Sequence, residues 1–393
     1  MRLLVVTHNY PRFPGDPAGA FVARIAQGAA RAGFEVRVVA PHAPGTSVRE
    51  TDQGLQLHRF RYAPEALERV AYTGDLHRGA LWSPLAALAF PAFLLAFRRA
   101  ITTEIRDFAP EIIHAHWWLP GGWLVSGRGT PYIVTCHGSD VRLLERSALF
   151  RRMARPVFRR AGRVTTVSRF LAADIGQLLK GDSGNLVPLP MPVDVAHFRQ
   201  GLAVPKTTPP LILYAGNLVP SKGVDALIRA YALLRGRGLT CSLRILGEGP
   251  ERQALERLAR DLGAPDVSWS DFVPQGEMPA EYGRSTITVL PTRGDAEGLG
   301  LTLVEALLAG SAVAGTRAGG IPEIIEDGVT GLLMPYEPEG MAESLGRLLA
   351  DPPLRQRLTD AGRGRVESVF ATEPATARFL QLYRDVAQHH SGN

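Results

Sequence analysis

Cysteine is scarce in this sequence, and no secretory leader is recognisable. Only Cys136 and Cys241 occur, far apart in the chain and in no paired spacing. The start, MRLLVVTHNYP, lacks the pattern of a signal peptide. Both absences argue for a reducing compartment, and we expect a cytoplasmic protein.

Long apolar runs are also missing, with one near exception. The stretch ALWSPLAALAFPAFLLAF at 80–97 carries no charge and reaches the lower length limit for a membrane span. Pro84 and Pro91 interrupt it, and a span here would cut an αβ-patterned region in two. We therefore interpret it as a buried helix, or as a helix lying on a membrane surface with Arg98 and Arg99 at its edge.

Negative charge is sparse in the first half. Residues 1–195 carry 24 Lys and Arg against 15 Asp and Glu, whereas the remainder carries 20 against 23. This excess indicates an anionic partner. The stretch 145–163 holds seven of the arginines on a helical pattern, which is typical of a solvated helix face or of a membrane contact. No aromatic stacking platform accompanies the charge, so we expect no nucleic-acid partner.

Short apolar runs alternate with helical patterns along the whole chain. This alternation is typical of an α/β fold whose parallel sheets are covered on both faces. Two series of runs predict two doubly wound, Rossmann-like domains. The expected strands are 2–6, 35–40, 111–115, 132–136 and 163–168, followed by 211–216, 241–247, 267–270, 286–291, 312–316 and 331–335.

Proline-rich stretches, LVPLPMPV and AVPKTTPP, separate the two series. We predict an N-terminal domain at 1–195, a linker at 196–209 and a C-terminal domain at 210–370. The tail at 371–393 has an amphipathic helical pattern, and we expect it to pack back on the N-terminal domain.

Polar and glycine-rich stretches follow the expected strands of both domains. They include THNYPRFPGDPAGAF, HAHWWLPGGW and CHGSD in the first, and NLVPSKG and RGDAEGLG in the second. Ligands of open α/β sheets bind beyond the carboxyl ends of the strands. We therefore expect these two edges to face one another across an interdomain cleft.

The stretch NLVPSKGVDALI joins a strand to a helix. Gly216 ends the strand, and Lys222 and Gly223 precede the helix. Backbone N–H groups at a helix start attract phosphate, and a lysine adds a full positive charge. The spacing matches neither a Walker loop nor a G-x-G-x-x-G fingerprint, so this pattern alone is a weak phosphate signal.

Two glutamates stand out in GDAEGLGLTLVEALLAG, at 294–310. Glu297 precedes a glycine-rich turn, and Glu305 lies within an apolar helical pattern. Gly298 and Gly300 allow close approach of a ligand to the backbone, and Glu305 is placed to accept hydrogen bonds from vicinal hydroxyls. The alternative is that Glu297 caps the helix and Glu305 is half-exposed.

This stretch, together with GTRAGGIPEIIEDGVTGLL, resembles the C-terminal domain of family 4 of the retaining GT-B glycosyltransferases. The similarity extends to YAGNLVPSKGVDALIRA and, more loosely, to IVTCHGSDV and RVTTVSRFL in the first half. It covers nearly the whole chain. The resemblance implies a GT-B enzyme that moves a sugar from a nucleotide-sugar to an acceptor, with retained anomeric configuration and without a bound metal.

The resemblance also implies roles for individual residues. Glu305 would bind the donor ribose, and Glu297 would face the donor sugar. Lys222 would bind the diphosphate and offset charge on the leaving group. His137 would lie at the reacting centre, with a purely structural histidine as the alternative. Further donor contacts would come from Gly19, Gly216, Asn217, Gly298, Leu299, Gly300 and Leu301.

One departure from the family lies at Asn217, where the family has arginine. Arginine clamps a diphosphate with two hydrogen bonds, which asparagine cannot do. Arg293 or an arginine of the first domain is a candidate substitute. The alternatives are a catalytically inactive module that binds nucleotide-sugar, or a sugar-nucleotide epimerase on the same fold.

His114 and His116 lie two residues apart and share a face of a strand end. With His137 and Asp140 they form an alternative metal site, but that site would leave the phosphate features of the second domain unexplained. We favour an acceptor-side surface made of His116, Trp117 and Trp118.

The sequence therefore predicts transfer of a hexosyl group from a nucleotide-diphosphate sugar to a polysaccharide or lipid-linked glycan acceptor. We expect no metal and no further cofactor. The basic first half and the stretch at 80–97 favour peripheral contact with the inner face of an anionic membrane.

Overall fold

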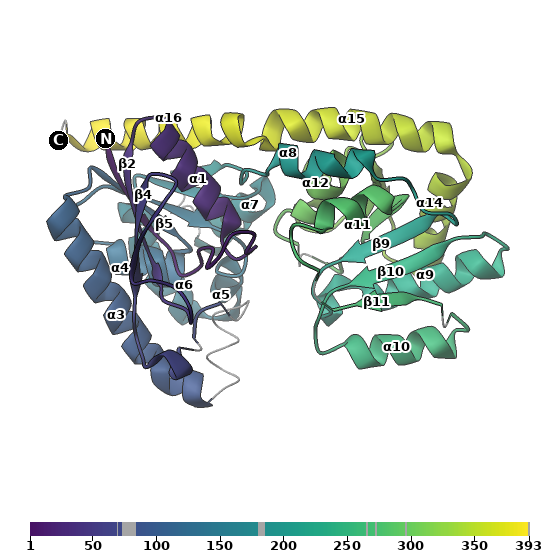
Figure 1. Cartoon of the computed structure of the whole chain (residues 1–393), viewed down its shortest axis with the longest axis horizontal. Helices are drawn as coiled ribbons and strands as arrows, with labels where there is room; N and C mark the ends of the chain where they lie inside the picture. The colour runs from purple at the N-terminus through teal and green to yellow at the C-terminus, as the bar shows by residue number, and fades with distance from the viewer. Residues whose placement is uncertain are drawn as a thin grey trace. The chain divides into compact units, whose positions relative to one another are not determined.

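The computed structural model describes residues 1–68, 70–72, 84–179, 185–264, 266–271, 273–294 and 297–391. The chain divides into two compact units (Figure 1). Unit 1 comprises Met1–Pro192 and Thr372–Asn393, and unit 2 comprises Val193–Ala371.

Unit 1 is built on an eight-stranded sheet in the order β3-β4-β2-β1-β5-β6-β7-β8. Its strands are β1 (Arg2–Val6), β2 (Glu35–Pro41), β3 (Arg49–Asp52), β4 (Leu55–Phe60), β5 (Ile112–His116), β6 (Tyr132–Cys136), β7 (Arg163–Thr166) and β8 (Leu186–Pro188). All neighbouring strands are parallel except β3 and β4. The chain winds in opposite directions from β1, so the switch point for ligand binding lies beyond the carboxyl ends of β1 and β5.

Helices cover this sheet because its central strands are buried on both faces. They are α1 (Ala20–Arg31), η1 (Glu65–Leu67), α3 (Pro84–Phe108), η2 (Trp118–Gly122), α4 (Trp123–Val125), α5 (Val141–Arg146), α6 (Ala148–Arg160), α7 (Arg169–Leu179) and α16 (Thr372–Ser391). Figure 1 shows α16, in yellow, running beside α1 of the same unit. Tyr383 anchors α16, since its hydroxyl lies 2.7 Å from Nδ1 of the buried His114.

The uncharged stretch at 80–97 belongs to α3 from residue 84 onward, and residues 80–83 lie outside the described residues. Phe93 and Phe97 are fully buried and pack on Phe60 of β4, whereas Leu95 is 49% exposed. The helix therefore buries one face in the core of unit 1. Within the described ranges, no helix combines the length and the apolar character that crossing a membrane requires.

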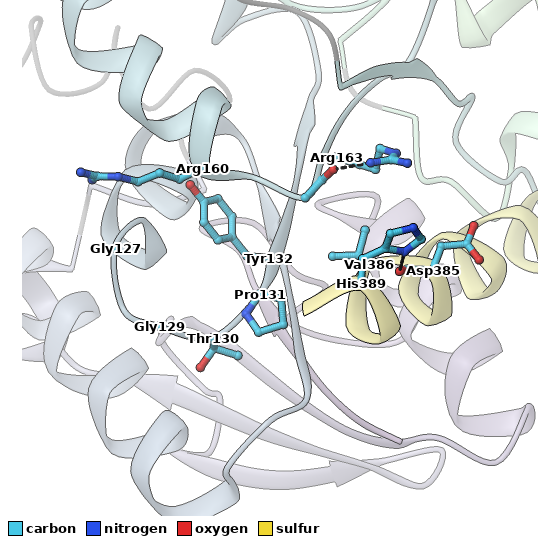
Figure 2. A pocket seen from close by; sticks show the side chains of 11 residues that line it. Gly127, Gly129, Thr130, Pro131, Tyr132, Arg160, Arg163, Asp385, Val386 and His389 are labelled. Carbon is cyan, nitrogen blue, oxygen red and sulfur yellow. Dashed lines mark hydrogen bonds between the residues drawn. The ribbon is translucent and has the colours of Figure 1, made fainter. Parts of the chain in front are cut away.

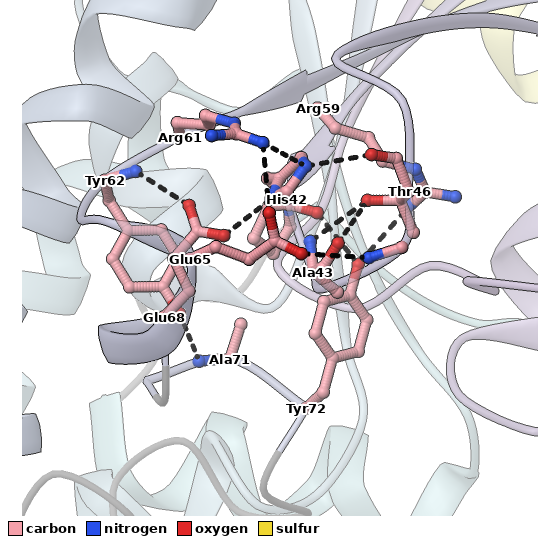
Figure 3. A network of polar contacts seen from close by, with 12 residues as sticks. His42, Ala43, Thr46, Arg59, Arg61, Tyr62, Glu65, Glu68, Ala71 and Tyr72 are labelled. Atoms are coloured by element: carbon pink, nitrogen blue, oxygen red, sulfur yellow. Dashed lines mark hydrogen bonds and ion pairs between the residues drawn. The ribbon is translucent and has the colours of Figure 1, made fainter.

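A buried polar network holds the chain that follows β4 (Figure 3). His42 and Glu68 are both fully buried, and Nδ1 of His42 lies 2.5 Å from the Glu68 carboxylate. Arg59, also buried, donates to the Pro11 carbonyl oxygen at 2.6 Å and to the Tyr72 hydroxyl at 3.3 Å. These bonds tie the segment after β4 to the loop after β1.

Unit 2 is built on a six-stranded parallel sheet in the order β11-β10-β9-β12-β13-β14. Its strands are β9 (Leu211–Ala215), β10 (Ser242–Leu246), β11 (Ser268–Ser270), β12 (Ile287–Leu290), β13 (Ala312–Thr316) and β14 (Leu332–Met334). The strand order reverses between β9 and β12, so a second ligand-binding edge lies beyond the carboxyl ends of these two strands. Both units confirm the predicted doubly wound α/β class.

The helices of unit 2 include a segment that we predicted to be a linker. They are α8 (Val195–Arg199), η3 (Gln200–Ala203), η4 (Pro220–Lys222), α9 (Val224–Gly236), α10 (Arg252–Asp261), α11 (Met278–Arg284), α12 (Leu301–Leu308), α13 (Ile321–Ile324), α14 (Pro338–Ala350) and α15 (Pro352–Phe370).

Residues 195–203, within or beside the predicted linker at 196–209, are helical and pack on unit 2. The Asp194 side chain caps α8 by accepting from the His197 N–H. A Cβ at Gly201 would lie 2.4 Å from the Pro279 carbonyl oxygen and 2.6 Å from the Ala309 Cβ. This close packing joins α8 and η3 to α11 and α12. The local sequence does not indicate this packing.

Candidate functional site

The predicted residues form one cluster in each unit. The cluster of unit 1 lies at the carboxyl ends of β1, β5 and β6. His116 ends β5, and His137 directly follows β6. These strands are neighbours in register, with His116 opposite Thr135, so the two histidines meet at one edge of the sheet.

A fully buried carboxylate organises the backbone around His137. Oδ1 of Asp140 accepts from the N–H groups of His137 and Gly138 at 2.9 and 3.1 Å. Its Oδ2 accepts from the N–H of Trp118 at 3.0 Å. Burial raises the pKa of Asp140, and these N–H donors act in the opposite direction. Asp140 therefore links the ends of β5 and β6, a role that sequence reasoning missed, although its position just before α5 is typical of a capping residue.

The His137 ring is held in an aromatic environment. Its centroid lies 4.3 Å from that of Trp117 and 4.9 Å from that of Phe21. Its Nε2 lies 3.1 Å from Nδ1 of His116. Burial lowers the pKa of both histidines well below the usual value, so both rings are neutral at physiological pH.

His114 does not join this pair as a ligand. Its Nδ1 contacts the Tyr383 hydroxyl and its Nε2 contacts the Thr135 hydroxyl, each at 2.7 Å. Burial lowers its pKa to about 3. Within the described ranges, no three His, Cys, Asp or Glu side chains gather as a set of metal ligands. Both ring nitrogens of His114 therefore have hydrogen-bond partners, so His114 is not available as a ligand for the alternative metal site.

The prediction that Trp118 lies on an acceptor-side surface is wrong. Its indole is fully buried against Phe150 and Phe158, and its Nε1 donates to the Asp140 carbonyl oxygen at 2.7 Å. Trp117 is 7% exposed and His116 is fully buried. These three residues support His137 from within unit 1 and do not form an open surface.

Gly19 ends the loop after β1 and precedes α1. Its φ is +67°, and a Cβ there would lie 2.2 Å from the Asn9 carbonyl oxygen. Only glycine satisfies both constraints. No side chain caps α1. Ala20 and Val22 donate their N–H groups to the carbonyl oxygens of Pro17 and Gly19, so this helix start offers an anion mainly the partial positive charge of the helix dipole.

The cluster of unit 2 centres on an ion pair between loops that follow neighbouring strands. Nζ of Lys222, at the end of η4, donates to Oε2 of Glu297 at 2.6 Å. The two side chains are 20% and 15% exposed. The Arg293 N–H also donates to the Ser221 carbonyl oxygen at 2.8 Å. Because β9 and β12 are adjacent, two residues far apart in sequence form one charged pair at the switch point.

Glu305 has a partner that explains a carboxylate on an apolar helix. The Tyr282 hydroxyl donates to its Oε2 at 3.0 Å. Burial and the neighbouring Glu305 raise the pKa of Tyr282 well above its usual value, so the phenol keeps the proton that it donates. Glu305 itself is half-buried, which leaves part of the side chain accessible.

The turn between the two glutamates carries backbone N–H groups for which the described residues offer no acceptor. Gly300, with φ +92°, is the N-cap of α12, and no side chain caps this helix. The alternative that Glu297 caps it is therefore wrong. Within the part of the chain that the structure describes, the N–H groups of Gly298, Leu299, Gly300 and Leu301 have no recorded hydrogen-bond acceptor. Gly320 supports the turn, since its N–H donates to the Glu297 carbonyl oxygen at 3.0 Å.

Asn217 follows Gly216 at the end of β9. Its carbonyl oxygen accepts from the Tyr214 hydroxyl at 2.9 Å, and its side chain is exposed. The backbone of Gly216 packs tightly on Gly247, where a Cβ would lie 1.9 Å from the Gly216 carbonyl oxygen. The backbone here is thus firmly placed.

In each unit, one cavity is lined by described residues. One, of about 430 Å³, lies in unit 2 at the carboxyl ends of β12, β13 and β14 and includes Thr292 and Gly294, close in sequence to Glu297. The other, of about 330 Å³, lies in unit 1 at the amino ends of β6 and β7 and beside α16. Figure 2 shows that Arg160 and Arg163 extend to opposite sides of this second cavity. None of the predicted site residues lines it.

The sequence is similar to known protein families in both units. The family model described as "Glycosyl transferases group 1" matches residues 199–365, and the model "Glycosyl transferase 4-like domain" matches residues 18–192.

Two curated proteins and one solved structure illustrate the similarity. A GDP-mannose-dependent alpha-(1-6)-phosphatidylinositol monomannoside mannosyltransferase of Mycolicibacterium smegmatis is 36% identical over 54% of this chain, and the match spans 60% of that protein's length. A D-inositol 3-phosphate glycosyltransferase of Acidothermus cellulolyticus is 29% identical over 97% of this chain and 89% of its own. Sucrose-phosphate synthase of Thermosynechococcus elongatus superposes with a TM-score of 0.78 at 20% identity, covering 98% of this chain and 99% of that one.

Proposed function

Because this chain belongs to the family 4 GT-B glycosyltransferases, we propose that it transfers a hexosyl group from a nucleotide-diphosphate sugar to a glycan or lipid-linked acceptor. The proposal includes retention of the anomeric configuration and independence from a metal ion. The observation that carries it is the Lys222–Glu297 pair at the switch point of unit 2.

The geometry of unit 2 suits a diphosphate leaving group. When the bond between the sugar carbon and the diphosphate oxygen breaks, its electron pair stays on the diphosphate. Lys222 supplies a positive charge to offset it, and the N–H groups of Gly298 to Leu301, which have no acceptor among the described residues, supply neutral donors. Lysine and amides together are a metal-free way to stabilise this charge.

The two glutamates suit the neutral parts of the donor. A carboxylate accepts hydrogen bonds only, so it favours hydroxyl groups over phosphate. We assign Glu305 to the ribose hydroxyls and Glu297 to the sugar hydroxyls. His137, in unit 1, is assigned to the donor sugar at the reacting centre. Asn217 favours one rival, an inactive binding module, because its amide cannot replace a bidentate arginine.

Calorimetric titration tests the donor site. We expect one of UDP, GDP and ADP to bind selectively, with the same affinity with and without magnesium. Lys222→Ala should weaken this binding about 10- to 100-fold, the effect of losing a charge-assisted hydrogen bond. Arg237→Ala removes the same charge at the opposite end of α9 and should leave the affinity unchanged. Binding that needs magnesium, or that survives in Lys222→Ala, contradicts the proposal, and binding without turnover supports the rival.

We further propose that α6 contacts the surface of a membrane that holds the acceptor. Arg152, Arg155 and Arg159 are exposed on this helix, and Leu149 is 62% exposed beside them. Within the described residues, none of the three arginines has an ion-pair partner. An unpaired basic helix face with an exposed leucine suits anionic lipid headgroups.

Vesicle flotation tests this contact. Changing Arg152, Arg155 and Arg159 together to alanine should weaken binding to phosphatidylglycerol vesicles about 100-fold, at about 1 kcal/mol for each arginine. The matched control changes three exposed arginines of unit 2, Arg229, Arg237 and Arg260, to alanine. Equal loss in both triple variants, or no binding of the unmodified protein at low salt, contradicts a specific α6 surface.

A further inference from the structure

His116 is a buried titratable side chain to which the proposed function assigns no role. It is fully buried, and its Nδ1 lies 3.1 Å from Nε2 of His137. Its own Nε2 is buried, and the described part of the chain offers it no hydrogen-bond partner. Because His116 has a partner at Nδ1 only, the positions of the N–H protons on both rings are restricted.

A single proton lies between the two neutral rings. In one arrangement, His137 donates from Nε2 and His116 carries its proton on Nε2. That leaves a buried N–H without an acceptor, which folded proteins avoid. In the other arrangement, His116 donates from Nδ1, and the orphaned atom of His116 is a lone pair. An unpaired acceptor is tolerated better than an unpaired N–H, so the second arrangement is favoured.

The position of the shared proton also determines which nitrogen carries the proton at the exposed edge of the His137 ring. A neutral imidazole carries one proton, so a His137 that accepts at Nε2 carries its proton on Nδ1. The contacts of the ring with Trp117 and Phe21, and the hydrogen bond of its backbone N–H to Asp140, hinder rotation of the ring. Within the described residues, no partner of His137 Nδ1 is recorded.

We propose that His116 is a positioning residue that holds His137 as the Nδ1–H tautomer, so that His137 offers a hydrogen-bond donor to the nucleotide-sugar and does not act as a base. The ligand atom that fits this donor is an oxygen with a free lone pair, such as a sugar hydroxyl or an oxygen of the leaving diphosphate. This inference rests on the proposed function for the identity of the ligand, but not for the tautomer.

The tautomer is measured directly by NMR of the full chain with 15N-labelled histidine. The His137 signals are identified by their loss in His137→Asn. We expect Nδ1 of His137 to show a protonated shift and Nε2 an unprotonated one. The opposite pattern in the unmodified protein overturns the proposal, whether or not turnover is observed.

Kinetics of two His116 variants provide the second test. His116→Phe keeps an aromatic ring but removes the donor, whereas His116→Asn keeps an N–H near the position of Nδ1. We expect kcat/KM for the nucleotide-sugar to fall about 10- to 100-fold in His116→Phe and to recover largely in His116→Asn. The affinity for the free nucleoside diphosphate, whose proposed site is in unit 2, should be unchanged in both.

These readouts separate two kinds of failure. An unmodified protein without nucleotide binding or turnover contradicts the proposed function. Normal turnover combined with an unchanged kcat/KM in His116→Phe contradicts only the inference about His116. A loss of thermal stability in His116→Phe leaves the tautomer measurement on the unmodified protein as the deciding result.

Discussion

Glu297→Gln is expected to lower turnover about 100- to 1000-fold while the protein stays folded. Groups that are preorganised around developing charge account for effects of this size when one of them is removed. The Glu297 carboxylate holds Lys222 at 2.6 Å, directly before the glycine-rich turn that starts α12. Glutamine keeps the shape of the side chain. It loses the negative charge that holds Lys222, and it retains only one of the two acceptor oxygens.

This loss is measured as release of nucleoside diphosphate at saturating donor, with a thermal melt of each variant. Glu339→Gln makes the same chemical change at an exposed site on α14 and should keep the original rate. A Glu297→Gln rate within twofold of the unmodified protein would remove Glu297 from the reacting centre. Loss of rate together with a large drop in melting temperature would point to a structural role instead.

Asp140→Ala is expected to destabilise unit 1 by at least about 3 kcal/mol. Three backbone N–H groups, of His137, Gly138 and Trp118, lose their acceptor inside the protein. Each buried donor left unpaired costs about 1 kcal/mol or more. Asp140→Asn keeps one acceptor oxygen, so we expect a smaller loss. In Asp140→Ala, the His137 backbone N–H loses the acceptor that fixes it, so turnover should fall as well.

Urea unfolding followed by tryptophan fluorescence measures this effect, since Trp117 and Trp118 report on unit 1. The matched control is Asp107→Ala, an aspartate of the same unit that pairs with Arg106 at the surface. Surface changes of this kind leave the stability almost unchanged. A similar midpoint for Asp140→Ala and Asp107→Ala would show that the buried carboxylate does not hold the loop.

Features governed by local chemistry were predictable from the sequence. Short β-branched runs indicated the central strands of both sheets, because a parallel strand buried on two faces must be apolar along its length. The glycine-rich turn before an apolar helix indicated the start of α12, and Gly300 does adopt a left-handed φ. Lys222 and Glu297 were each placed after a strand, at the edge where ligands bind.

Features that depend on which segments pack together were not predictable. The stretch after Asp194 has the composition of a linker, but the space beside Ala309 and Pro279 makes α8 and η3 part of unit 2. Trp118 has the side chain of an acceptor platform, yet Phe150 and Phe158 bury it.

The sequence by itself determined the α/β class, the family resemblance and the kinds of residue at the two strand edges, because these follow from periodicity and short-range spacing. Only the tertiary structure decided that Lys222 meets Glu297, that Tyr282 supports Glu305, and that His116 contacts His137. Contacts of this kind depend on strand order and register, which bring distant residues within hydrogen-bond distance and leave little trace in the local sequence.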